Sequence, residues 1–258
     1  MNLLRSFLVA VALAASTLVA SAQNPEFDFY PVFRRWARQV QSADPVSSDV
    51  LLERYREKLT SEGVGAPEID RRLTLIRSKR EALEADFWNR FFTAPTPGFN
   101  TEPNEFLTVV VEKRKPGRAL DVGMGSGRNA LYLAKLGWDV TGFDPAEKAV
   151  ALAGERAKAL GVKITTAVAM DSTFDYGRDR WDLILYSWVV PTEPQKIIDS
   201  LKPGGIVLFE GSTTWIPDNR ILDMFKPLRV LKYTNARVRS DFFNREEMSV
   251  MRFLGEKK

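Results

Sequence analysis

The residues best placed to do chemistry in this chain are three closely spaced glycines that follow an acid. They lie in ALDVGMGSGRNALYLAKLGWDVTGFDP, residues 119–145, where Asp121 opens the motif and Asp144 ends the next apolar stretch. The glycines are Gly123, Gly125 and Gly127. Glycine lets a backbone approach a ligand closely, and the amides that open a following helix point toward that ligand. An acid such as Asp144 is placed to bind two ribose hydroxyls, so the segment predicts a nucleoside-binding loop.

Two nucleoside ligands are compatible with such a loop. The dinucleotide fingerprint G-x-G-x-x-G needs a glycine where this chain has Arg128. Asp121 would repel a pyrophosphate, whereas it can receive the ammonium of an amino acid. The loop therefore favours an adenosine ligand with an amino-acid tail, S-adenosyl-L-methionine, over a nicotinamide dinucleotide.

Apolar strands alternate with amphipathic helices from about residue 105 onward. Strands are expected at 118–123, 138–144, 162–169, 181–187 and 206–212, with helices at 105–115, 128–137, 145–161 and 193–205. This alternation is typical of βαβ units in a parallel sheet that is covered on both faces. The tail, residues 228–257, predicts two longer strands that form an antiparallel hairpin at the sheet edge.

The region before the glycine loop has a different pattern. Helices are expected at 31–40, 47–65 and 66–92, the last with one apolar face. That face consists of Ile69, Leu73, Ile76, Leu83, Phe87 and Phe91. The proline-rich stretch at 93–106 predicts a loop or linker.

On these residues the chain resembles the class I S-adenosyl-L-methionine-dependent methyltransferases. The resemblance covers residues 99–258 and includes LKPGG, Leu201 to Gly205, as the turn into the fifth strand. It implies an α/β fold with a Rossmann-like, seven-stranded, mostly parallel sheet, helices on both faces and an antiparallel C-terminal hairpin. An α-helical N-terminal region at 23–98 precedes this domain.

The resemblance also implies roles for single residues. Asp121 and the three glycines would hold the methionine part of the cofactor, and Asp144 would bind the ribose. The remaining cofactor residues lie near the adenine or at the end of the fourth strand, and they are Pro145, Met170, Asp171 and Tyr186. Met170 would cover the adenine, and Asp171 would accept a hydrogen bond from its amino group.

The methyl acceptor is expected beside the carboxyl end of the fourth strand. Ser187 and Trp188 lie there, and the sequence SWVVP departs from the signature of nucleobase amino-methyltransferases. Phe99 and Asn100 are candidates for a lid over the site. The acceptor is predicted to be a small molecule, and no catalytic residue is singled out.

Composition excludes several chemistries. The chain has no Cys and no His, so a Ser-His-Asp triad and a metal site built on Cys or His are impossible. No metal is predicted. The net charge of +4 is small and its basic residues are interleaved with acids, so no nucleic-acid partner is predicted.

The first 22 residues have the pattern of a secretory signal peptide. Arg5 precedes an apolar run from Phe7 to Ala20, and Ala20-Ser21-Ala22 fits the cleavage pattern. An exported mature chain from Gln23 with no stable membrane span is expected; the alternative is an uncleaved anchor. S-adenosyl-L-methionine is made in the cytosol, so two other functions stay open. They are an exported, non-catalytic nucleoside-binding module with this fold and a nicotinamide-dependent oxidoreductase.

Overall fold

The computed structural model describes residues 25–43, 48–213, 216, 219–243 and 247–258. The expected signal peptide lies outside these residues, so export stays a prediction. Within the described residues, no helix is both long and apolar enough to cross a bilayer.

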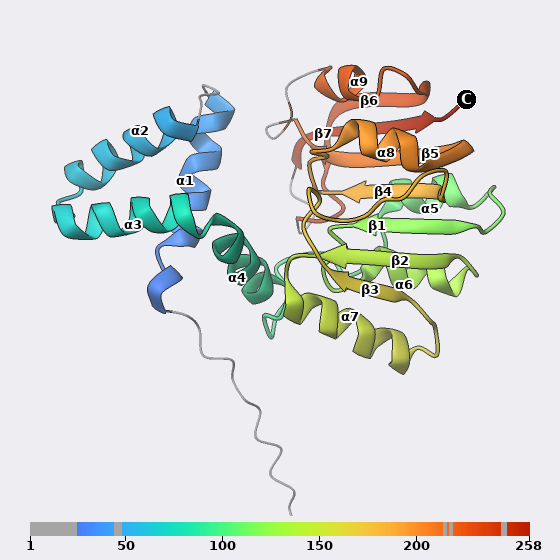
Figure 1. Ribbon diagram of the computed structural model, residues 1–258, viewed down its shortest axis with the longest axis horizontal. Coiled ribbons are helices and arrows are strands. Elements are labelled where there is room, and N and C mark those ends of the chain that lie inside the picture. Colours follow the sequence, from blue (N-terminus) through green and yellow to red (C-terminus); the bar gives the residue numbers. More distant parts are fainter. Residues whose placement is uncertain (1–24, 44–47, 214–215, 217–218, 244–246) are drawn as a thin grey trace, which may run out of the picture.

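A seven-stranded sheet in the order β3-β2-β1-β4-β5-β7-β6 forms the body of the molecule (Figure 1). Its strands are β1 (Arg118–Val122), β2 (Asp139–Asp144), β3 (Thr165–Val168), β4 (Trp181–Ser187), β5 (Leu201–Ser212), β6 (Arg229–Arg239) and β7 (Glu247–Glu256). β1 to β5 pair in parallel, while β7 runs antiparallel to both of its neighbours, β5 and β6. The predicted Rossmann-like sheet and its antiparallel hairpin are confirmed.

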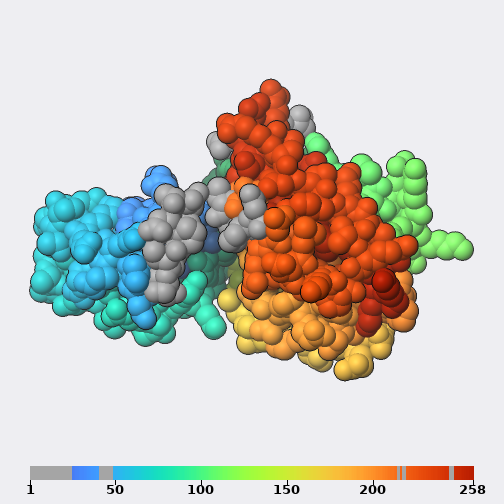
Figure 2. Space-filling model, turned by 90° about the horizontal axis from the view of Figure 1, so that it is seen from above, coloured from blue at the N-terminus to red at the C-terminus, as the bar shows by residue number. Residues whose placement is uncertain are grey.

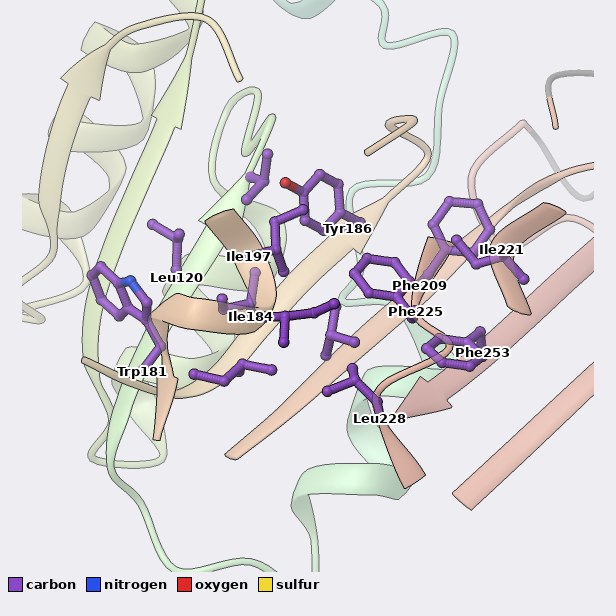
Figure 3. Packing of buried hydrophobic residues seen from close by; sticks show 14 of the residues in the cluster. Leu120, Trp181, Ile184, Tyr186, Ile197, Phe209, Ile221, Phe225, Leu228 and Phe253 are labelled. Carbon is purple, nitrogen blue, oxygen red and sulfur yellow. The ribbon is translucent and has the colours of Figure 1, made fainter. Parts of the chain in front are cut away.

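Alternating side chains of the central strands build two cores on opposite faces of the sheet. On one face, Ile184 and Tyr186 pack with α8 (Pro194–Ser200) and α9 (Arg220–Met224), as Figure 3 shows. On the other face, Leu183 and Leu185 pack with α5 (Glu105–Val111) and α6 (Arg128–Lys135). α7 (Glu147–Ala159) lies between β2 and β3 in the chain and packs through a smaller apolar cluster. Strands that are buried on both faces explain the nearly continuous apolar runs of the sequence.

The N-terminal helices form a separate lobe beside the sheet (Figure 2). A short 3-10 turn (Pro25–Phe27) leads into α1 (Tyr30–Ala43), α2 (Ser48–Ser61), α3 (Ala66–Ser78) and α4 (Arg80–Phe92). The lobe has its own core, centred on Tyr55, Leu73 and Leu83, which are almost completely buried.

The prediction of one continuous helix over 66–92 is wrong, because the chain leaves helical geometry at Lys79 (φ −128°, ψ 27°). This break redirects the second half of the segment. Ile69 and Leu83 pack inside the lobe, whereas Phe91 packs with residues of the sheet domain. The single apolar face seen in the sequence therefore serves two different cores.

The predicted helix at 193–205 is also too long. α8 ends at Ser200, and β5 starts at Leu201 opposite Trp181. The register then shifts, since Leu183 pairs with Ile206. Gly204 has a φ of +76°, a value that allows this bulge. The LKPGG motif thus belongs to an irregular strand entry rather than to the turn after a helix.

Candidate functional site

The glycine loop joins β1 to α6 at the carboxyl ends of the parallel strands, which is where open α/β sheets bind ligands. All three loop glycines have a left-handed backbone, with φ of +52° at Gly125 and +86° at Gly127. Gly127 is the N-cap of α6, and no side chain caps that helix start. The loop therefore combines a conformation suited to glycine with a helix N-terminus that offers amides.

Asp121 lies beneath this loop and is 1% exposed. Among the described residues, neither carboxylate oxygen has a hydrogen-bond partner. Burial raises the pKa of Asp121 to about 7, although the nearby Arg128 guanidinium and Ala130 amide act in the opposite direction. A buried carboxylate without a partner is destabilising in a folded chain. Such a group is expected where a ligand supplies the missing partner.

Asp144, at the end of β2, is also buried, but its oxygens are partly engaged. One oxygen accepts from the amide of Gly125 (2.9 Å), and the other accepts from the amide of Ala146 (2.8 Å). Burial raises its pKa to about 6, against the effect of those two amides. The carboxylate thereby fixes the glycine loop relative to β2, and each oxygen retains acceptor capacity for a ribose hydroxyl.

Of the residues predicted around the adenine, Pro145 directly follows β2, whereas Met170 and Asp171 follow β3. Pro145 and Met170 are half-buried. Both oxygens of Asp171 are engaged, one by the hydroxyls of Tyr176 and Tyr186, the other by the amide and hydroxyl of Thr192. Tyr186 itself is fully buried, and Figure 3 shows its ring in the core beneath β4. Tyr186 therefore contacts the predicted adenine residue Asp171 only through its hydroxyl.

An aromatic cluster occupies the expected acceptor side. Phe99 and Trp188 are 4% and 5% exposed, and both pack against Phe242. Trp188 has a φ of +64°, which is unusual for a bulky residue and is found at functional sites. Asn100 donates from its side chain to the Asp241 carbonyl (2.8 Å). The predicted lid residues thus attach the 99–104 segment to the loop that follows β6.

A buried polar network beneath this cluster was not predicted from the sequence. Asp241 accepts hydrogen bonds from Trp188 Nε1 (3.0 Å) and Asn104 Nδ2 (2.8 Å), and Arg128 lies 3.6 Å away. The side chain of Asn104 also donates to Glu210 (2.7 Å). Burial, together with the neighbouring Asp241, raises the pKa of Glu210 to about 7. A lone acid in the apolar run IVLFEGS was the signal available in the sequence.

Arg128 connects this network to the predicted site. Its guanidinium donates to Ser187 Oγ (3.3 Å) and to the Glu102 carbonyl (2.8 Å). It also lies over the ring of Phe242, 5.0 Å from the centroid. Arg128, which stands where a dinucleotide fingerprint has its third glycine, therefore connects the 99–104 segment, the end of β4 and the loop after β6.

The last turn of α4 meets the glycine loop, a contact that the sequence did not predict. The ring of Phe92 occupies the space that a Cβ on Gly125 would take. Asn89 Oδ1 accepts from the amide of Lys148 in the first turn of α7 (2.8 Å). In Figure 1 the arrowheads of β1, β2 and β4 point toward this helix. The apolar face of α4 does not indicate what the helix packs on, because such a face packs equally well on any apolar core.

Comparisons with known proteins identify the class of this domain. Residues 119–205 match a family model described as a methyltransferase domain. A probable S-adenosyl-L-methionine-dependent methyltransferase, TehB of Haemophilus influenzae (strain 10810), is 43% identical over 20% of this chain and 18% of its own. A protein-L-isoaspartate O-methyltransferase of Chlorobaculum tepidum is 29% identical over 39% of this chain and 47% of its own. The chain thus spans less than half the length of these relatives.

Solved structures agree on the fold. The crystal structure of TehB from Haemophilus influenzae superimposes with a TM-score of 0.51 at 22% identity, covering 68% of this chain and 67% of that one. A structure described as the conversion of a disulfide bond into a thioacetal group during echinomycin biosynthesis superimposes with a TM-score of 0.55 at 19% identity. The superposition covers 69% of this chain and 91% of that one. Residues 119–205 are therefore similar to a methyltransferase domain, and the cofactor that this similarity implies is S-adenosyl-L-methionine.

The residues on this loop fit that cofactor. Asp121 is a buried acceptor that lacks a donor, and the ammonium of the cofactor is a donor. The left-handed backbone of Gly125 suits a loop that approaches a ligand closely. The alternatives of a nicotinamide oxidoreductase and a non-catalytic module are favoured by none of these observations.

Proposed function

We propose that this protein transfers a methyl group from S-adenosyl-L-methionine to a small-molecule acceptor. The observation that supports this most strongly is the carboxylate of Asp121, buried without a partner under the glycine loop. A sequence does not keep an unpaired acid in its core for stability, because hydrophobic replacement there is neutral or stabilising. An ammonium group would supply the missing hydrogen bonds.

The chain's own residues would bind and align the reactants. Asp121 would fix the ammonium and Asp144 the ribose, while the start of α6 would offer amides to the carboxylate. When bound, the cofactor supplies an already activated methyl group on sulfur. Trp188 and Phe99 would hold the acceptor in an apolar environment in line with that methyl group. The two acids beneath this aromatic cluster, Glu210 and Asp241, are engaged by Asn104 and by arginines.

Calorimetric titration tests this proposal directly. The purified chain is titrated with S-adenosyl-L-methionine, S-adenosyl-L-homocysteine and NAD. We expect dissociation constants on the order of micromolar, about −8 kcal/mol, for the first two and no binding of NAD. Binding of NAD alone would support the oxidoreductase, and binding of no ligand would contradict the proposed function.

The affinity for the cofactor should depend on pH. Because Asp121 has a pKa of about 7 without a ligand and an ammonium favours its ionised form, binding releases a proton. Below pH 7 the affinity falls, by about tenfold at pH 6 relative to the plateau above pH 8. Titrations from pH 5.5 to 8.5 measure this dependence. The Asp121→Asn variant should lose the step near pH 7, and a step that persists in that variant would assign it to another group.

A further inference from the structure

The C-terminal turn of α4 lies on the face of Gly125 where a ligand would make its closest approach. The second glycine of such loops is small so that the backbone can come close to the ligand. Here the ring of Phe92 already fills that space, and Gly125 is buried. Phe92 is itself supported by Trp88 and Phe99, with ring centroids 5.6 Å and 5.3 Å away.

The same turn of α4 also supplies a hydrogen-bond acceptor for a backbone amide at the start of α7. The N-cap residue of α7 is Ala146, which has no side chain able to accept a hydrogen bond from the first amides. Asn89 supplies the missing acceptor from another helix, since its Oδ1 binds the amide of Lys148. Asp144 and Pro145 directly precede this helix start. Asn89 and Phe92 therefore contact both sides of the predicted cofactor site, one at α7 and one at the glycine loop.

α4 is tied to the helical lobe as well as to the sheet domain. Glu84 of α4 accepts from Tyr30 Oη (2.8 Å) and pairs with Arg34 of α1 (2.9 Å). On its other side, α4 continues into the mostly exposed loop at 93–98, which carries two prolines and a glycine. A movement of the lobe and α4 together relative to the sheet would use this loop as its hinge.

We propose that the last turn of α4 competes with the cofactor, so that Asn89 and Phe92 must leave α7 and Gly125 before S-adenosyl-L-methionine can bind. This inference rests on the proposed function. It also accounts for the state of Asp121, which is enclosed although it has no partner. A side chain that merely lined an open site would contact the ligand, whereas Phe92 contacts the loop backbone itself.

Removing the two contacts should strengthen cofactor binding. Closure of α4 reduces the apparent affinity, because the intrinsic affinity is multiplied by the fraction of molecules that are open. Loss of a helix cap such as Asn89 corresponds to a factor of about five, so Asn89→Ala should bind S-adenosyl-L-methionine about fivefold more tightly. Phe92→Ala should give a gain of about the same size or larger. Asn89→Asp, which keeps a capping oxygen and adds a charge that is favourable at a helix N-terminus, should not bind more tightly than the wild type. Glu81→Ala, at the exposed start of α4, should bind like the wild type.

A reversible lock provides an independent test. The chain has no cysteine, so a double variant with Asn89→Cys and Lys148→Cys contains a single possible disulfide. Oxidation should hold α4 on α7 and abolish cofactor binding in calorimetry, and reduction should restore it. This readout needs no enzymatic activity and does not depend on how well Phe92→Ala folds.

The outcomes separate this inference from the proposed function. Tighter binding by Asn89→Ala together with loss of binding in the oxidised pair supports the competition. If the wild type binds but Asn89→Ala and Phe92→Ala bind less tightly and the oxidised pair still binds, α4 is part of the bound site and the inference is wrong. If no form of the protein, including Phe92→Ala, binds S-adenosyl-L-methionine, both the proposed function and this inference fail.

Discussion

Replacing Asp121 by asparagine is expected to weaken cofactor binding while making the cofactor-free protein more stable. The asparagine side chain keeps the shape of the carboxylate but loses its charge, so it cannot form charge-assisted hydrogen bonds with an ammonium. Such bonds contribute about 1.5–3 kcal/mol, so their loss should raise the dissociation constant roughly 10- to 150-fold. Calorimetric titration with S-adenosyl-L-methionine measures this change.

The gain in stability should depend on pH in a defined direction. The pKa of Asp121 is raised to about 7 in the folded chain, so the folded state binds the proton more tightly than the unfolded state. Stability contributed by this group therefore falls as pH rises from about 4 to about 7. The difference in free energy of unfolding between Asp121→Asn and wild type should be near zero at pH 4 and reach up to about 4 kcal/mol at pH 8.

A matched variant distinguishes the site from a general effect of charge. Asp139 is exposed at the amino end of β2, and its Arg118 contact of 3.5 Å is a surface pair of little energetic value. Asp139→Asn should leave both cofactor affinity and stability almost unchanged. If Asp121→Asn instead lowered stability at pH 8 and bound the cofactor normally, Asp121 would be an ordinary structural residue.

Replacing Asp241 by alanine should have the largest effect on stability among these variants. The carboxylate of Asp241 is the shared acceptor for Trp188 Nε1 and Asn104 Nδ2, and it faces the largely buried Arg128. Its removal takes away the acceptor that Trp188 and Asn104 share and the carboxylate that faces Arg128, and breaking such a buried pair costs about 3–5 kcal/mol. Denaturant unfolding, monitored by tryptophan fluorescence, measures the change.

Asp241→Asn is the companion variant, because it retains an oxygen acceptor of the same shape. It should recover part of the stability that Asp241→Ala loses. Glu155, an exposed acid on α7, offers a control, and Glu155→Ala should change the free energy of unfolding by less than about 0.5 kcal/mol. A loss of less than 1 kcal/mol in Asp241→Ala would show that water replaces the carboxylate and that the network is not tightly enclosed.

Much of the sheet domain was predictable because its signals are local. Each parallel strand is a short apolar run, and each glycine or proline that ends an element is visible in the sequence. Two boundaries were wrong for a common reason. The early start of β5 depends on the pairing of Leu201 with Trp181 in another strand, which periodicity does not report. The break at Lys79 leaves the apolar spacing unchanged, so periodicity does not report it either. The assigned cofactor and substrate roles of single residues stay predictions.

The sequence alone determined the alternation of strands and helices in the parallel part of the sheet, the glycine loop, and the placement of Asp121 and Asp144 at neighbouring strand ends. These features follow from periodicity and from the conformations open to glycine. Only the tertiary structure decided that α4 folds back onto Gly125 and that Asn104, Glu210 and Asp241 meet. Asn104 and Asp241 are 137 positions apart, and their contact exists only because the sheet brings both chain segments to the same edge. Contacts of this kind depend on packing between elements, which leaves no periodic trace in the sequence.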